Sequence, residues 1–170
     1  KMANYMAMEN WISTYDGGNW HGNDSAWRMV SDLMKISVYG ATSGRVETTP
    51  QRRIFSIIDG VVGGEGDGPL FPDAKPVGVV LAGNNQLATD LVAIRLMGFD
   101  WRKLKWCVDL LQNRDFDFGL HGEADVTIHS GVPEWADPFA SRDRFLAFRP
   151  HPGWIDYLEL DAVPPAGKRG

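Results

Sequence analysis

The sequence predicts a single α/β domain built on a mixed, largely parallel sheet flanked by helices. Two nearly unbroken apolar runs, at residues 54–58 and 77–82, predict strands buried on both faces, as parallel strands are. A helical pattern at residues 86–97 directly follows the second run. Antiparallel pairing is the alternative, because residues 60–76 between the runs lack the helix pattern that a parallel crossover normally contains. We expect parallel strands.

Length and composition limit the classes of protein to consider. The 170 residues are enough for one domain with a hydrophobic core, which we place at residues 1–163, with a disordered tail at 164–170. A formal net charge of −5 argues against a nucleic-acid partner. No apolar run approaches the roughly 20 residues that span a bilayer, so we expect no membrane partner. Cys107 is the only cysteine, so we expect no iron–sulfur cluster within this chain and a cytoplasmic location.

The first helix is expected to begin after residue 24 or 25, with Asp24 or Ser25 as its N-cap. Arg28 and Asp32 are spaced to pair on its surface. A second helix-forming segment, at residues 101–113, carries Cys107 on its apolar stripe, which predicts an inert core thiol.

The helix at residues 86–97 is apolar on nearly all sides and should end at Gly98. Asp90 and Arg95 lie in that apolar surround, too far apart around the helix to pair with each other. Each therefore needs its own partner, because an unpaired buried charge costs several kcal/mol or more, on the order of a domain's whole stability. The candidate partners of Asp90 are basic residues elsewhere in the chain: Arg28, Arg52 and Arg53.

The remaining segments are less regular. Further strands are expected at residues 124–129, 145–148 and 155–160, with a loop at 135–142.

The main candidate site is the acidic, glycine-rich segment that follows the first strand. Asp59, Glu65 and Asp67 have the carboxylates to bind a divalent metal or to act as acid and base, and Asp90 is a fourth candidate metal ligand. The glycines that would let backbone N–H groups approach a cofactor are Gly63, Gly64 and Gly66. The alternative interpretation is a tight solvated turn, which uses the same residue types.

Three further residues complete the candidate site. Asn84 and Asn85 open the helix at residue 86, where free N–H groups could bind an anionic cofactor, although Asn is also a favoured N-cap. If the strands are parallel, Asp59 and Asn84 lie at one edge of the sheet. His21, within a polar cluster, is a candidate catalytic proton carrier near the glycine-rich segment; its alternative is a hydrogen-bonded structural histidine.

Several blocks of the sequence resemble the DUF362 family, and specifically its C-terminal part. The blocks are residues 19–29, 56–69, 75–78, 90–100 and 148–154. The resemblance implies a shared site around Asp59, Glu65, Asp67 and Asp90. Some members carry a fused ferredoxin-like iron–sulfur module, which suggests redox chemistry, but this chain lacks the cysteines for such a module.

We therefore expect an enzyme, or an enzyme fragment, that acts on a small molecule at an acidic glycine-loop site, with redox as a candidate chemistry. Its other partner would be a missing N-terminal portion or a redox protein. The alternative is a non-catalytic scaffold domain that binds a metal or a partner through the same segment.

Overall fold

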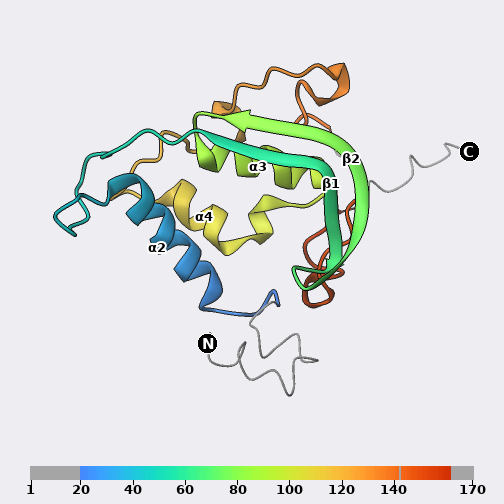
Figure 1. The fold of residues 1–170 in the computed structure, drawn as a ribbon, viewed down its shortest axis with the longest axis horizontal. Coiled ribbons are helices and arrows are strands. Elements are labelled where there is room, and N and C mark those ends of the chain that lie inside the picture. Colours follow the sequence, from blue (N-terminus) through green and yellow to red (C-terminus); the bar gives the residue numbers. More distant parts are fainter. Residues whose placement is uncertain (1–19, 142, 162–170) are drawn as a thin grey trace, which may run out of the picture.

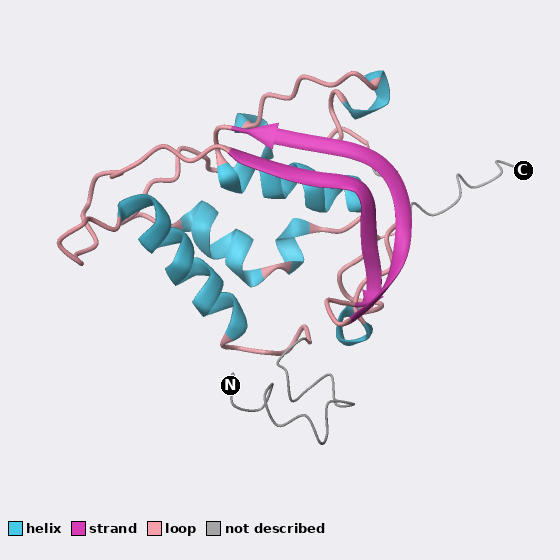
Figure 2. Ribbon diagram, viewed as in Figure 1, coloured by secondary structure: helices cyan, strands magenta, loops and turns pink. Residues whose placement is uncertain are grey.

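The structure is a computed structural model that describes residues 20–141 and 143–161. Its main elements, in chain order, are α2 (Ala26–Tyr39), β1 (Ser56–Asp67), β2 (Phe71–Gly83), α3 (Gln86–Met97) and α4 (Lys105–Gln112). Figure 1 shows β1 and β2 as one long curved hairpin, with α3 beneath it and α2 and α4 beyond α3. From α4 to residue 161 the described chain consists of loops with short 3-10 turns, as Figure 2 shows.

In the described part of the chain the sheet consists of two antiparallel strands, so the prediction of a mixed, largely parallel sheet is wrong. Ser56 pairs with Gly83 and Asp67 pairs with Phe71, with residues 68–70 as the turn between the strands. The segment expected to be a glycine loop is therefore the distal half of a hairpin. Since residues 60–76 contain no crossover helix, the chain returns directly beside the strand it has just left.

The apolar runs were misleading because the described residues cover only one face of this sheet. Burial alternates along the strands: Ile57 and Val80 are 66% and 62% exposed, whereas Ile58 and Val79 are half-buried. This alternation is typical of an antiparallel sheet with one open face. Helix α3 packs against β2 and covers the inner face.

Helix α3 has the predicted bounds and the predicted C-terminal glycine. Gly98 adopts φ 89°, the left-handed conformation that glycine tolerates, and its N–H donates to the carbonyl of Arg95. The core forms where α3 faces α4, and its most completely buried side chains include Leu87, Leu91 and Cys107. The prediction of a buried Cys107 is confirmed, and burial raises the pKa of its thiol.

Helix α2 begins where expected, with Ser25 as its N-cap residue, but the capping hydrogen bonds come from Asn23 and not from the side chain of Ser25. The side-chain oxygen of Asn23 accepts the backbone N–H groups of Ser25 and Ala26, at 2.9 and 2.8 Å. Asp24 instead pairs with Arg28 at 3.0 Å, so the expected pair between Arg28 and Asp32 does not form. Helix α4 is shorter than the predicted 101–113 segment, because residues 101–103 form a separate 3-10 turn.

The strands predicted at residues 124–129, 145–148 and 155–160 are wrong. The last contributes only an isolated bridge, from Glu159 to Phe99. The N–H groups of Leu146 and Phe148 donate to carbonyls at the end of α3, which gives residues 146–148 an extended path without a sheet. The predicted tail at 164–170 lies outside the described residues. Within the described part, no helix has the length and apolar character needed to cross a membrane.

Candidate functional site

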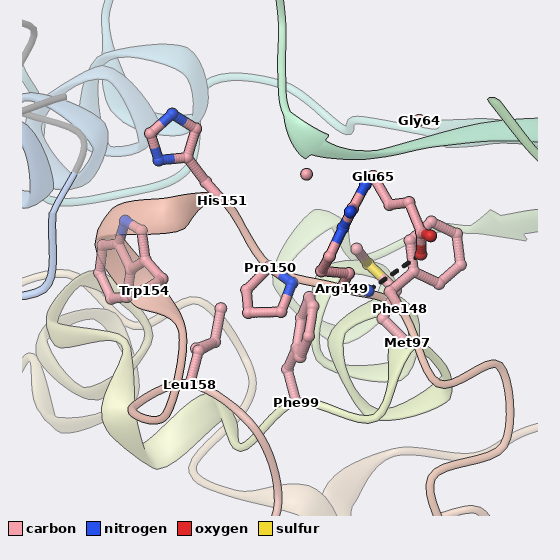
Figure 3. A pocket seen from close by; sticks show the side chains of 11 residues that line it. Gly64, Glu65, Met97, Phe99, Phe148, Arg149, Pro150, His151, Trp154 and Leu158 are labelled. Carbon is pink, nitrogen blue, oxygen red and sulfur yellow. Dashed lines mark hydrogen bonds between the residues drawn. The ribbon is translucent and has the colours of Figure 1, made fainter. Parts of the chain in front are cut away.

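The tip of the hairpin folds against residues 148–158, and a cavity of about 240 Å³ opens between them. Three polar side chains line it: Glu65, Arg149 and His151. The apolar lining consists of Met97, Phe99, Phe148, Pro150, Trp154 and Leu158. Figure 3 shows Glu65 entering from the hairpin on one side of this cavity and Trp154 on the other. We call this cavity the hairpin pocket.

Glu65 links the hairpin to the segment that crosses it. Its Oε2 accepts the backbone N–H of Arg149 at 2.9 Å and the ammonium of Lys75 at 3.0 Å. These two donors, the Arg149 N–H foremost, hold the pKa of Glu65 below its ordinary value, although partial burial opposes them. On the neighbouring strand, Asp73 pairs with the guanidinium of Arg149. The carboxylate of Glu65 is thus ionised and already occupied by groups of this chain.

His151 and Asp67 form the second polar contact at this tip. The Nε2 of His151 lies 3.3 Å from a carboxylate oxygen of Asp67. The Nδ1 accepts the backbone N–H of Gly153 at 3.2 Å, so in the neutral ring the proton is on Nε2, the nitrogen that faces Asp67. Both ring nitrogens are therefore engaged.

The glycines of the hairpin make room for this chain's own segments. A Cβ built on Gly63 would lie 2.7 Å from the ring of Phe148, and one on Gly64 would lie 2.9 Å from Pro72. Gly66 has φ +77°, and a Cβ there would lie 2.6 Å from the guanidinium of Arg149. The close approach expected of a cofactor is made here by Phe148, Pro72 and Arg149.

Asp59 and Asn84 do not join this site. Asp59 pairs across the sheet with Val80, and its Oδ1 accepts the N–H of Val61 at 3.1 Å. Glu65 lies six positions further along β1, roughly 20 Å along an extended strand. Asn84 follows Gly83 at the open end of the hairpin, which is the end away from the tip and from Glu65. The shared edge predicted for these residues required parallel strands and is absent.

Asn85 is an N-cap, as the alternative interpretation held. Its Oδ1 accepts the N–H of Ala88 at 3.1 Å, and its Nδ2 donates to the carbonyl of Phe118 at 2.7 Å. Both ends of this amide are bonded within the chain.

His21 packs against the segment that lines the far side of the hairpin pocket. Its backbone N–H donates to the carbonyl of Gly153, and its ring Nδ1 lies 3.2 Å from the same oxygen. The ring stacks on Tyr157 with 4.4 Å between centroids. Within the described residues, His21 has no hydrogen bond to an acid of the glycine-rich segment.

Asp90 lies half-buried on α3, away from the other three acids. Two of its expected partners are engaged elsewhere: Arg28 with Asp24, and Arg52 with the carbonyl of Ser37 at 2.7 Å. Across residues 20–141 and 143–161, Asp90 forms no ion pair, and burial raises its pKa to about 6.

The expected divalent metal has no evident site in the described part of the chain. Those residues contain no group of three or more His, Cys, Asp or Glu side chains placed to hold an ion. Asp59, Glu65, Asp67 and Asp90 are spread over the hairpin and α3. Metal binding thus stays a prediction.

Sequence reasoning gave too little weight to Arg149 and His151. The sequence feature that could have identified them is the block at residues 148–154, where two prolines and a glycine form a compact turn around His151. Nothing in the sequence says that this turn, more than 80 residues from Glu65, packs on the hairpin tip.

Comparisons of the chain with protein-family models, with curated proteins and with solved structures find no match in any of the three. The resemblance to the DUF362 family therefore stays a prediction from the sequence blocks.

Proposed function

We propose that this domain binds a small molecule in the hairpin pocket, as an enzyme fragment or as a binding domain. The observation that carries the proposal is an open apolar cavity with a few convergent polar groups, which is the usual composition of a ligand site. Its volume of about 240 Å³ suits a one- or two-ring molecule. An apolar ring would contact Phe99, Phe148 and Trp154, and a hydrogen-bond acceptor would face the guanidinium of Arg149.

The polar contacts support binding more than proton transfer. A general base needs a free lone pair within reach of the substrate, and both nitrogens of His151 are engaged. Glu65 is held ionised by two donors and would need to release one of them to accept a proton. We therefore assign no catalytic step to either residue, and the redox chemistry suggested by the resemblance has no residue assigned to it.

Indole is a suitable probe, because it combines an apolar ring system with one N–H donor. We expect saturation-transfer NMR to show that indole binds the wild-type domain and that Trp154→Ala reduces the binding at least fivefold. Trp135→Ala is the matched control, since Trp135 lies in a different 3-10 turn and does not line the pocket. Equal binding to the two variants, or no binding to the wild-type domain, would show that the pocket is not the ligand site.

A second candidate function, the scaffold domain, is favoured by the exposed outer face of the hairpin. Ile57, Val62 and Val80 are between 59% and 66% exposed on one face of the two-stranded sheet. An apolar patch of this kind often marks a protein interface. We propose as its partner an extended polypeptide segment that adds a strand to β1. Among the described residues β1 pairs only with β2, while β2 carries Pro72 and Pro76, which have no N–H to donate.

A random nonapeptide display library tests this second function. Peptides selected on the domain should alternate apolar and polar residues and should lose binding to Ile57→Lys. They should retain binding to Leu33→Lys, which adds the same charge at a similarly exposed position on α2. Selected peptides without the alternation, or binding that survives Ile57→Lys, would exclude the strand-addition surface.

A further inference from the structure

Asp59 is the only charged residue in the half of the hairpin that lies away from its tip, residues 56–62 of β1 and 76–83 of β2. It is exposed on the outer face, two positions from the exposed Ile57. Directly opposite Asp59 on β2 is Val80, which is apolar and also exposed. A single negative charge therefore lies within an otherwise apolar and polar-neutral face.

No cation in the described part of the chain forms an ion pair with Asp59. The ion pairs of the hairpin lie at its tip, where Lys75 contacts Glu65 at 3.0 Å and Arg149 contacts Asp73. One carboxylate oxygen of Asp59 accepts the N–H of Val61 at 3.1 Å. Since the side chain is exposed, solvent stabilises the rest of its charge.

The same half of β1 has a free edge among the described residues. At the tip, the carbonyl of Arg149 accepts the N–H of Gly66 beside the sheet. Residues 56–60 have backbone hydrogen bonds only to β2 within the described chain. A strand added there would place one side chain directly opposite Asp59, with Cβ atoms about 5 Å apart, and would displace water from the carboxylate. At that distance an opposite charge stabilises the pair of strands and a like charge destabilises it.

We propose that the polypeptide segment that adds to β1 carries a lysine or arginine opposite Asp59, between apolar residues that contact the outer face. The proposal rests on the strand addition described above as the second candidate function, and it specifies the chemistry of that partner. Asp59 would select the partner by excluding strands with an acid at that position. A second copy of β1 does not fit, because the symmetric antiparallel pairing of residues 56–62 would place two Asp59 carboxylates opposite each other.

Nonapeptide libraries selected separately on the wild-type domain and on Asp59→Asn test the charge. The asparagine keeps a side-chain oxygen that can accept the Val61 N–H, so the variant removes the charge and little else. We expect peptides selected on the wild-type domain to carry a basic residue at one position of the alternation about threefold more often than those selected on Asp59→Asn. The matched control is Asp115→Asn, which removes an exposed acid from the loop after α4 and should leave the preference unchanged.

A double-mutant cycle then measures the pair itself. Replacement of the selected lysine by norleucine should weaken binding to the wild-type domain about two- to fivefold, and should have almost no effect on binding to Asp59→Asn. Alternating peptides without a basic preference, or a preference that survives Asp59→Asn, would overturn this proposal and leave strand addition standing. If no alternating peptides are selected at all, strand addition fails and this proposal fails with it.

Discussion

Glu65 is the side chain that most directly joins the hairpin to the rest of the molecule. It contacts one donor on β2, Lys75, and one on the crossing segment, Arg149. Because Lys75 also donates to the carbonyl of Ala147, these side chains connect the hairpin to residues 147–149 at two adjacent points.

We therefore expect Glu65→Gln to lower the free energy of unfolding by about 1–2 kcal/mol at pH 7. The pKa of Glu65 is lowered in the folded state, so its stabilising contribution is present above the ordinary carboxyl pKa and is lost as the pH falls through the folded value. Urea melts at pH 7 and pH 3 measure this, and the difference between the two proteins should shrink at pH 3. The control is Glu134→Gln, an exposed position where we expect a change within about 0.5 kcal/mol.

The contribution of Asp90 to stability changes with pH in the opposite direction. Its pKa is raised to about 6 from 3.8, so the folded state holds a proton that the unfolded state releases at lower pH. The resulting stabilisation is full below about pH 4 and is lost as the pH rises through 6. The sequence led us to expect an ion pair here, and hence a loss of stability on substitution.

With no such pair in the described residues, Asp90→Asn should raise stability at pH 8 by about 1–3 kcal/mol and leave it nearly unchanged at pH 4. Thermal or urea unfolding at the two pH values measures the difference. A destabilised variant at pH 8 would mean that Asp90 has a cationic partner.

At the scale of elements, the local patterns were predictable and the pairing was not. The bounds of α3, its cap at Asn85 and its end at Gly98 follow from side-chain chemistry within a few residues. The direction of β1 relative to β2 depends on which faces of the sheet are covered, and an apolar run alone does not contain that information. Glu65 and Asp67 were identified as site residues, but their partners Arg149 and His151 come from more than 80 residues away.

Substitution of the glycines tests whether the glycine-rich segment packs as a hairpin against Phe148. Gly63→Ala should lower the free energy of unfolding by about 1–3 kcal/mol, because its Cβ would meet the ring of Phe148. Gly68→Ala is the matched control, since its Cβ would meet Pro72 at an ordinary 3.8 Å. If Gly63 instead lies in a solvated loop, urea melts of the two variants will coincide.

At the scale of the whole molecule, the apolar residues are not all in the core. Helix α2 exposes Met29, Leu33 and Ile36, each more than half exposed, and the outer face of the hairpin is also apolar. The described residues therefore include two groups of apolar side chains that lie outside the core and are exposed. This arrangement fits the expectation of a further polypeptide partner, although the described residues do not include one.

Because the outer face of the hairpin is exposed, we expect charged substitutions on it to have little effect on the free energy of unfolding. A double variant, Ile57→Lys with Val80→Lys, should change the free energy of unfolding by less than about 1 kcal/mol, because neither side chain is buried. It should also reduce the fluorescence of the apolar dye ANS in the presence of the folded domain. Strong destabilisation would show that the face is covered in solution.

In the structure, residues 60–76 form a hairpin tip that residues 148–151 cross. Nuclear Overhauser contacts in the isotope-labelled protein test it most directly. We expect cross-strand contacts between Gly64 and Ala74, which pair in the register, and contacts from Gly66 to Arg149, whose carbonyl accepts the Gly66 N–H at 3.1 Å. A glycine-rich segment that shows only sequential contacts, with none to residues 148–151, would contradict it.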